Sequence, residues 1–171
     1  METAYCCPMR SMAKTRFLAD EMLGSLARWL RIMGYDAEYA RDMSDDDILR
    51  QAVEEDRILL TRDRELAARA GDRGMLLQGD DAVGHLEDVV RRFDLTFDEG
   101  HTRCALCNRE LAPLSAEEAA RYVPPRVLER HREFLSCPSC GRVYWKGTHW
   151  TGICGHVGEA VRRARTNSGP R

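Results

Sequence analysis

The chain has 171 residues, which is enough for one ordinary domain and a small appendage. Its hydrophobic content of 43% is typical of a globular protein, and no apolar run is long enough to cross a membrane. An odd number of cysteines, seven, argues against a secreted disulfide scaffold, so we expect a cytoplasmic protein.

The two ends of the chain and the distribution of charge set further segments apart. Residues 1–15 lack the apolar segment of a signal peptide, so we expect a disordered leader there, with Met9 and Met12 as alternative starts. A flexible polar tail is expected over residues 166–171. The formal net charge is −2, but residues 16–100 carry −9 and residues 101–171 carry +6. This asymmetry fits a metal site beside a surface for a phosphate backbone, and ordinary surface charge explains it as well.

Residues 16–100 alternate short apolar runs with helical patterns. We expect strands over Arg16–Asp20, Tyr35–Arg41, Arg57–Thr61 and Met75–Gln78. The helices between and after them are marked by Leu23 to Met33, by a buried stripe of Ile48, Leu49, Ala52 and Val53, by Arg64–Ala70, and by Val83 to Phe93. This order predicts an α/β fold, with a parallel sheet that has right-handed crossovers and helices on both faces.

The pattern changes near Asp98–Gly100, and we expect a second, smaller unit over residues 101–165. Two Cys-x-x-Cys pairs bracket an insertion, in which Ser115 and Glu118 form a capping box for a short helix that Pro124 and Pro125 interrupt. Arg142–Trp145 reads as a strand. A terminal helix is predicted from Thr148, since Trp150, Ile153, Val157 and Val161 share one face.

The two Cys-x-x-Cys pairs are the most specific motif in the chain. Two such pairs supply four thiolates for a closed tetrahedral Zn²⁺ site, which has no open position and is therefore structural. Disulfides and a thioredoxin-like pair are the alternatives, and both fit the context less well. The predicted zinc ligands are Cys104, Cys107, Cys137 and Cys140.

Acidic residues follow the first three predicted strands. Asp20 ends the first, the run Asp45–Asp47 follows the second, and Asp63 follows the third. In a parallel sheet these strand ends share one edge, and converging carboxylates call for a divalent cation such as Mg²⁺ or Mn²⁺. Two such cations about 3.5–4 Å apart activate a water and stabilise the leaving oxygen in phosphodiester cleavage. Asp20, Asp45 and Asp63 are the candidate catalytic residues, although helix capping alone explains each acid taken singly.

Further charged residues surround this edge. Asp46, Asp47 and Asp81 are candidate additional ligands, and Asp80 is a neighbouring candidate with helix capping as its alternative. Guanidinium groups match the geometry of phosphates, so arginines near the edge are candidate substrate contacts, with ion pairing to the acids as the alternative. These arginines are Arg28, Arg31, Arg62 and Arg64.

Two rival enzyme classes with acids at strand ends are disfavoured. A response-regulator receiver needs a lysine near its phospho-acceptor, and residues 16–100 contain none. A haloacid-dehalogenase-like phosphatase needs an Asp-x-Asp on the first strand, whereas Glu21 and Met22 follow Asp20.

Several motifs together resemble the Mut-seven C-terminal RNase family (Mut7-C) over roughly Arg16 to Ile153. They are Phe17–Gly24, Leu26–Arg31 with Gly34–Asp36, Arg57–Arg64, Arg103–Asn108, and Cys137–Gly141 with Tyr144–His149. The resemblance implies a PIN-like nuclease domain followed by a zinc ribbon, with single-stranded RNA as substrate and Mg²⁺ or Mn²⁺ as cofactor. By position, Asp20, Asp45 and Asp63 match the metal-binding acids that the family is expected to have.

The expected function is therefore a metal-dependent endoribonuclease. A non-catalytic zinc-ribbon adaptor that binds RNA or the ribosome is the alternative from a different class, and a toxin-type PIN nuclease is a third.

Overall fold

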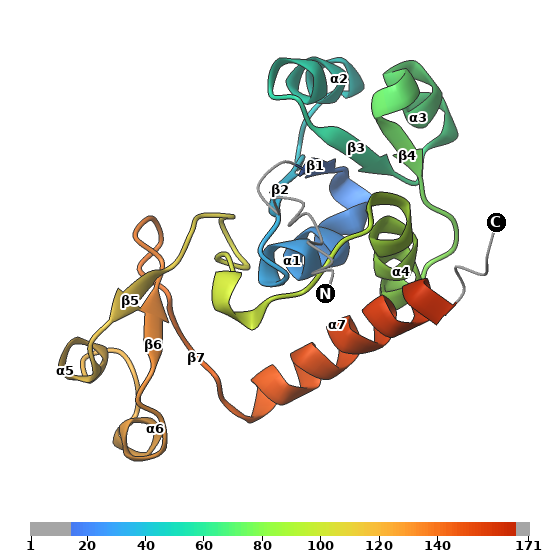
Figure 1. The fold of residues 1–171 in the computed structure, drawn as a ribbon. Helices are drawn as coiled ribbons and strands as arrows, with labels where there is room; N and C mark the ends of the chain where they lie inside the picture. The colour runs from blue at the N-terminus through green and yellow to red at the C-terminus, as the bar shows by residue number, and fades with distance from the viewer. Residues whose placement is uncertain (1–14, 167–171) are drawn as a thin grey trace, which may run out of the picture.

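The computed structural model describes residues 15–166 and contains a parallel and an antiparallel sheet (Figure 1). The parallel sheet has the strand order β2-β1-β3-β4, which confirms the predicted parallel α/β arrangement. Its strands are β1 (Arg16–Ala19), β2 (Asp36–Tyr39), β3 (Ile58–Thr61) and β4 (Gly74–Leu76).

Helices cover both faces of the parallel sheet. α2 (Asp45–Glu54) and α3 (Arg64–Ala70) lie on one face, and α1 (Gly24–Ile32) and α4 (Ala82–Phe93) lie on the other (Figure 1). The side chains of β1 alternate between the two layers, since Phe17 and Ala19 join the core around α1 and α4 whereas Leu18 joins the core around α2. Short 3₁₀ turns precede α1, follow α3 and follow α4, at Glu21–Leu23, Gly71–Arg73 and Glu99–His101.

One predicted core position in α2 is wrong. Val53 was expected in the buried stripe but is 64% exposed, whereas Ile48 and Ala52 are buried. Ile48 and Ala52 are four residues apart and cover the sheet with one face of the helix, which turns the adjacent Val53 toward solvent.

The segment between the two cysteine pairs is richer in structure than the sequence predicts. It holds β5 (Ala112–Leu114), α5 (Ala116–Ala119), α6 (Pro125–Arg130) and β6 (Phe134–Ser136), and β7 (Val143–Trp145) follows the second pair. These strands form the antiparallel sheet β5-β6-β7, called the C-terminal sheet below. The proline pair was expected only to interrupt a helix, but Pro125 also starts α6, because proline is tolerated at the first position of a helix.

The last helix, α7 (Thr148–Thr166), runs from the C-terminal sheet back to the parallel sheet (Figure 1). Val157, Ala160 and Ala164 are buried in the same core as α1 and α4, so α7 joins the first half of the chain to the second. The predicted leader (1–15) and tail (166–171) lie outside the described residues except for Thr15 and Thr166. None of the helices within residues 15–166 has the length and apolar character that crossing a bilayer requires.

Candidate active site and zinc site

The ends of β1 and β3 form the topological switch point of the parallel sheet. From β1 the chain crosses to β2 on one side, and it then returns past β1 to β3 and β4 on the other. Open α/β sheets bind their ligands in the crevice outside such strand ends. Asp20 follows β1 here, and its backbone N–H donates to the carbonyl of Leu60 in β3 at 3.0 Å. The switch point therefore brings Asp20 to the end of β3.

Asp20 is buried, with only 5% of its surface exposed. Its carboxylate accepts hydrogen bonds from the N–H of Met22 at 3.0 Å, from the N–H of Arg62 at 3.3 Å and from the hydroxyl of Thr61. The predicted capping role of Asp20 is present, because the Met22 contact caps the 3₁₀ turn before α1. The other two donors come from the end of β3 and fix the carboxylate toward the switch point.

Asp63 is joined to Asp20 through Thr61. The Thr61 hydroxyl donates to Asp20 and accepts from the N–H of Asp63 at 2.9 Å. One carboxylate oxygen of Asp63 accepts from the N–H groups of Glu65 and Leu66 at 2.7 and 2.9 Å and caps α3. The side chain is exposed, and its second oxygen has no hydrogen bond from any residue between 15 and 166. Thr61 was not among the predicted site residues, although its position two residues before Asp63 was a usable signal.

The acids after β2 are held apart from this pair. Asp45 lies 3.5 Å from a guanidinium nitrogen of Arg69 in α3, and Asp46 pairs with the same arginine. Asp47 accepts from the Ser44 hydroxyl at 2.6 Å, within the capping arrangement of α2. The role of Arg69 could not be predicted from local sequence patterns, because its proximity to α2 depends on the packing of α2 against α3.

The remaining acidic candidates have structural partners too. Asp81 caps α4 by accepting from the N–H groups of Val83 and Gly84 at 3.2 and 3.0 Å. Asp80 forms an ion pair with Arg62. Between residues 15 and 166, no three carboxylates bring their oxygens within 4.8 Å of one another. The structure thus brings together Asp20 and Asp63, and it leaves Asp45 paired with Arg69.

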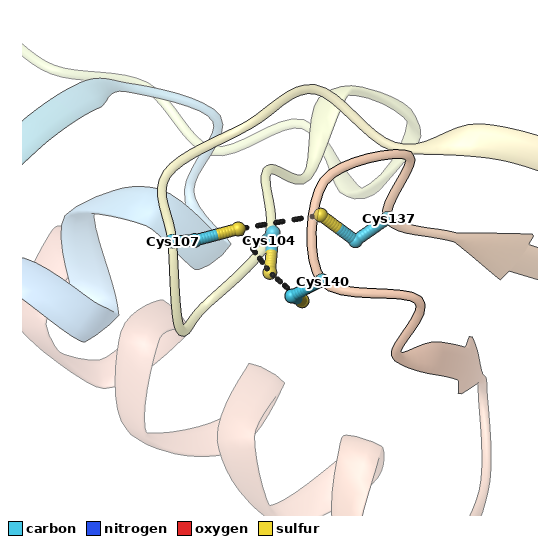
Figure 2. A group of neighbouring side chains, drawn as sticks. All are labelled: Cys104, Cys107, Cys137 and Cys140. Atoms are coloured by element: carbon cyan, nitrogen blue, oxygen red, sulfur yellow. Dashed lines mark hydrogen bonds between the residues drawn. The ribbon is translucent and has the colours of Figure 1, made fainter.

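The four predicted zinc ligands do come together, in the cluster drawn in Figure 2. Their sulfurs all lie within 4.8 Å of one another, with Cys107 3.4 Å from Cys104 and 3.3 Å from Cys137, and with Cys104 3.7 Å from Cys140. A tetrahedral ion with Zn–S bonds of about 2.3 Å places its sulfurs about 3.8 Å apart. The cysteines are therefore close enough to bind a metal such as zinc.

The two cysteine pairs have the same backbone conformation. The N–H of Asn108 donates to the carbonyl of Cys104 at 3.0 Å, and the N–H of Gly141 donates to that of Cys137 at 2.9 Å. Asn108 and Gly141 have φ values of +64° and +69°, a conformation that Asn and Gly adopt more readily than other residues. Each turn therefore presents its two thiols to one centre.

One family of known proteins matches most of the chain. The family model of the Mut7-C RNAse domain matches residues 15–157, which is most of the chain. The chain belongs to the Mut7-C RNAse domain family. No curated protein and no solved structure matches it significantly. Membership of the Mut7-C family indicates a nuclease-type function with RNA as substrate.

In this Mut7-C chain, Arg31 is not at the acidic edge. It was predicted as a phosphate contact, and it is 6% exposed and donates to the carbonyls of Ala37 at 2.7 Å and of Leu106 at 2.8 Å. Its Nε and one terminal nitrogen are therefore engaged with backbone oxygens. Arg31 thus holds the first cysteine turn against β2.

The other three predicted arginines differ in their surroundings. Arg62 is half-buried in its ion pair with Asp80, and Arg64 is exposed beside Asp63. Arg28 is exposed on α1, where it lines a groove that faces the C-terminal sheet. Only Arg62 and Arg64 therefore remain beside the Asp20–Asp63 pair.

Asn108 attaches the first cysteine turn to the edge strand β2. Its side-chain oxygen accepts from the N–H of Ala37 at 3.1 Å, and its amide donates to Asp36 at 2.7 Å and to Glu38 at 3.0 Å. The side chain thus satisfies an N–H group on the outer edge of the parallel sheet, which would otherwise be left unpaired in a buried position.

Tyr144 of β7 contacts the cysteine cluster directly. Its hydroxyl lies 3.1 Å from the sulfur of Cys104. Burial alone would raise the pKa of the Cys104 thiol, but hydrogen bonds from Tyr144 and from the backbone of Cys107 and Leu106 outweigh it and lower the pKa to about 6. The cluster therefore favours a thiolate at Cys104, which is the form that binds a metal.

Proposed function

We propose that this chain is a metal-dependent endoribonuclease that cleaves single-stranded RNA at the switch point of a PIN-like sheet. The observation that carries the proposal is the Asp20–Thr61–Asp63 arrangement, in which the Thr61 hydroxyl donates to the buried Asp20 carboxylate and accepts from the backbone N–H of Asp63, whose own carboxylate is partly free, at the end of β1 and β3. Membership of the Mut7-C RNAse domain family supports RNA as the substrate.

The donor set at this edge suits a hard cation such as Mg²⁺ or Mn²⁺, because carboxylate oxygens are the ligands that such ions prefer. Asp20 and Asp63 are the proposed ligands, and Asp45 would complete the set after leaving Arg69. Asp46, Asp47 and Asp81 are weaker candidates, since pairing or helix capping occupies them. When bound, the cation supplies activation of water and neutralisation of charge at the phosphodiester.

The protein groups around the acids have separate tasks in this proposal. Thr61 and the N–H of Arg62 orient the Asp20 carboxylate, and the capping contacts of Asp63 leave its second oxygen free for a ligand. Arg62 and Arg64 are placed to hold the phosphate, since Arg64 is exposed and has no ion-pair partner among the described residues. The four cysteines would hold a structural Zn²⁺ in a zinc ribbon, and that site takes no part in the chemistry.

The test is cleavage of a labelled single-stranded RNA with Mg²⁺ or Mn²⁺ by the wild type, Asp20→Asn and Asp63→Asn. Asp94→Asn is the matched control, since Asp94 is exposed at the far end of α4 in a left-handed conformation that asparagine tolerates. We expect both site variants to lose activity by at least 10²-fold, as general acid–base and metal-site losses commonly do, while the control keeps it. Cleavage that persists in both site variants would overturn the assignment.

A non-catalytic RNA-binding adaptor is the second candidate. The observation in its favour is that Arg69 forms ion pairs with both Asp45 and Asp46 and so engages two of the candidate acids. An adaptor would bind RNA and cleave none with any divalent metal, and Arg69→Ala would not change that result.

A further inference from the structure

A groove separates the end of α1 from the C-terminal sheet. It has a volume of about 760 Å³ and is lined by α1, by the 3₁₀ turn at Glu99–His101, by all three strands of the C-terminal sheet and by the start of α7. Three of the elements that line it, α1, β7 and α7, are labelled in Figure 1. The volume falls within the range of about 300–1,000 Å³ that small-molecule sites occupy.

The charge of this groove is opposite to that of the protein as a whole. Five basic residues line it, Arg28, Arg103, Arg132, Arg142 and Lys146, against two acidic ones, Glu99 and Glu133. The whole chain has a net charge of −2. The groove therefore attracts an anion although the chain is acidic.

Three of these basic side chains are free to bind. Arg28, Arg132 and Arg142 are exposed, and their guanidinium groups have no hydrogen bond or ion pair within residues 15–166. Arg103 and Lys146, by contrast, pair with Glu110 and Glu99 at 3.1 and 3.2 Å. Exposed arginines without partners on the wall of a groove match the oxygens of a phosphate backbone.

Aromatic side chains form the other component of the groove. Trp145 of β7 and Trp150 of α7 both line it and are half-buried. The indole N–H of Trp150 donates to Glu99 at 3.2 Å, which fixes the orientation of the ring. Half-buried indoles beside arginines are the combination with which proteins bind single strands, since bases stack on the rings and phosphates contact the cations.

We infer that this groove binds unstacked nucleotides of single-stranded RNA, at a subsite separate from the acidic edge. The inference rests on the proposed function for the identity of the polymer. A base lies against Trp145 or Trp150, and the flanking phosphates contact Arg132, Arg142 and Arg28.

The groove and the acidic edge are within reach of one strand. Arg28 lies eight residues after Asp20 along α1 and the turn that precedes it, which corresponds to roughly 12 Å at 1.5 Å per residue. A few nucleotides cover such a distance. The subsite thus holds the strand on the side of α1 and positions the segment that reaches Asp20.

The first test measures binding without cleavage. In the Asp20→Asn background, the affinity for a labelled single-stranded RNA oligonucleotide is measured by fluorescence anisotropy over a range of salt concentrations. The groove variant is Arg132→Ala/Arg142→Ala. The control is Arg121→Ala/Arg126→Ala, which removes the same charge from exposed positions in or next to α5 and α6, outside the groove.

We expect the groove variant to bind about tenfold more weakly at 0.1 M salt. The slope of log K against log salt should become less negative by about 1.4, which corresponds to two lost phosphate contacts. The control should change both quantities by much less. Equal losses in the two double variants would overturn the subsite, since the binding would then follow net charge alone.

Two more comparisons test the aromatic component. Single-stranded RNA should quench the tryptophan fluorescence saturably, and a duplex of the same sequence should bind more weakly, because its bases are not free to stack. Equal affinity for strand and duplex, or no quenching at saturation, would overturn the stacking.

The outcomes also separate this subsite from the proposed function. RNA binding that depends on the groove, without cleavage by the wild type, would retain the subsite and reject the nuclease. Cleavage by the wild type with normal binding by the groove variant would reject the subsite alone.

Discussion

The carboxylate of Asp36 makes the stability of this fold dependent on pH. Asp36 lies on the edge strand β2, where it accepts from Arg57 at 2.7 Å, from Asn108 at 2.7 Å and from Arg16 at 3.2 Å. Burial alone would raise its pKa, but these hydrogen bonds outweigh the burial and lower the pKa to about 2. The same carboxylate thus ties β1, β3 and the first cysteine turn to β2.

The pH dependence of the free energy of unfolding follows from the difference between the pKa of Asp36 in the folded and in the unfolded chain. An unfolded Asp has a pKa of about 3.9, so the unfolded chain takes up the proton first as the pH falls. The contribution of Asp36 is therefore fully present above about pH 5 and is lost progressively toward about pH 2. A difference of nearly two pKa units corresponds to about 2 kcal/mol of the free energy of unfolding.

The assay compares urea unfolding of the wild type and Asp36→Asn with excess zinc at pH 7 and pH 3. The two proteins share every other titrating group, including the thiols, so the difference between them isolates Asp36. We expect the difference in the free energy of unfolding to shrink by about 1 kcal/mol between pH 7 and pH 3. Asp72→Asn should show no such change, because Asp72 is exposed and has no hydrogen-bond or ion-pair partner in the described part of the chain. A difference that is the same at both pH values would refute the reasoning.

Three further predictions concern the cysteine cluster and α7. Asn108→Gly should lower the free energy of unfolding by about 2–4 kcal/mol, because it removes three hydrogen bonds. Asn108→Ala should lower it by roughly 1 kcal/mol more, because alanine is strained at the φ of +64°. Urea unfolding of these variants that matches the wild type would contradict both expectations. Elemental analysis should find about one zinc per chain. Cys104→Ser should lose the ion, and its C-terminal sheet should lose its protection from proteolysis. A wild type without zinc would exclude the site. Gly155→Ala in α7 should raise the free energy of unfolding by about 0.5–1 kcal/mol, since nothing lies within 4 Å of an added Cβ. Thermal melts measure the change, and a lower melting temperature would show that this glycine has a packing role.

The regular part of the fold could be predicted from local patterns. Three of the four strands of the parallel sheet, β1, β3 and β4, are short and mainly apolar. Asp20, Ser44, Asp63 and Asp81 cap the turns and helices that follow the strands. Such caps act over two or three residues, so they are visible in the sequence. The cysteine spacing is equally local, which explains why the cluster was predicted in full.

What the sequence could not predict depends on packing between distant segments. Arg31 lies in the last turn of α1, the helix that follows Asp20, and it donates to the carbonyl of Leu106, 75 residues away. Arg69 reaches Asp45 only because α2 and α3 lie on the same face of the sheet. The short strands β5 and β6 pair with each other, and β6 pairs with β7, so they depend on contacts between segments that local patterns do not show.

The central claim is that the carboxylates at the switch point cleave RNA. The most direct measurement is the rate of cleavage of a single-stranded RNA by the wild type and by Asp20→Asn, with Mn²⁺ present and with Asp94→Asn as the control. We expect cleavage by the wild type and the control and a loss of at least 10²-fold in Asp20→Asn, with RNA binding retained. Equal rates for the wild type and Asp20→Asn would contradict it.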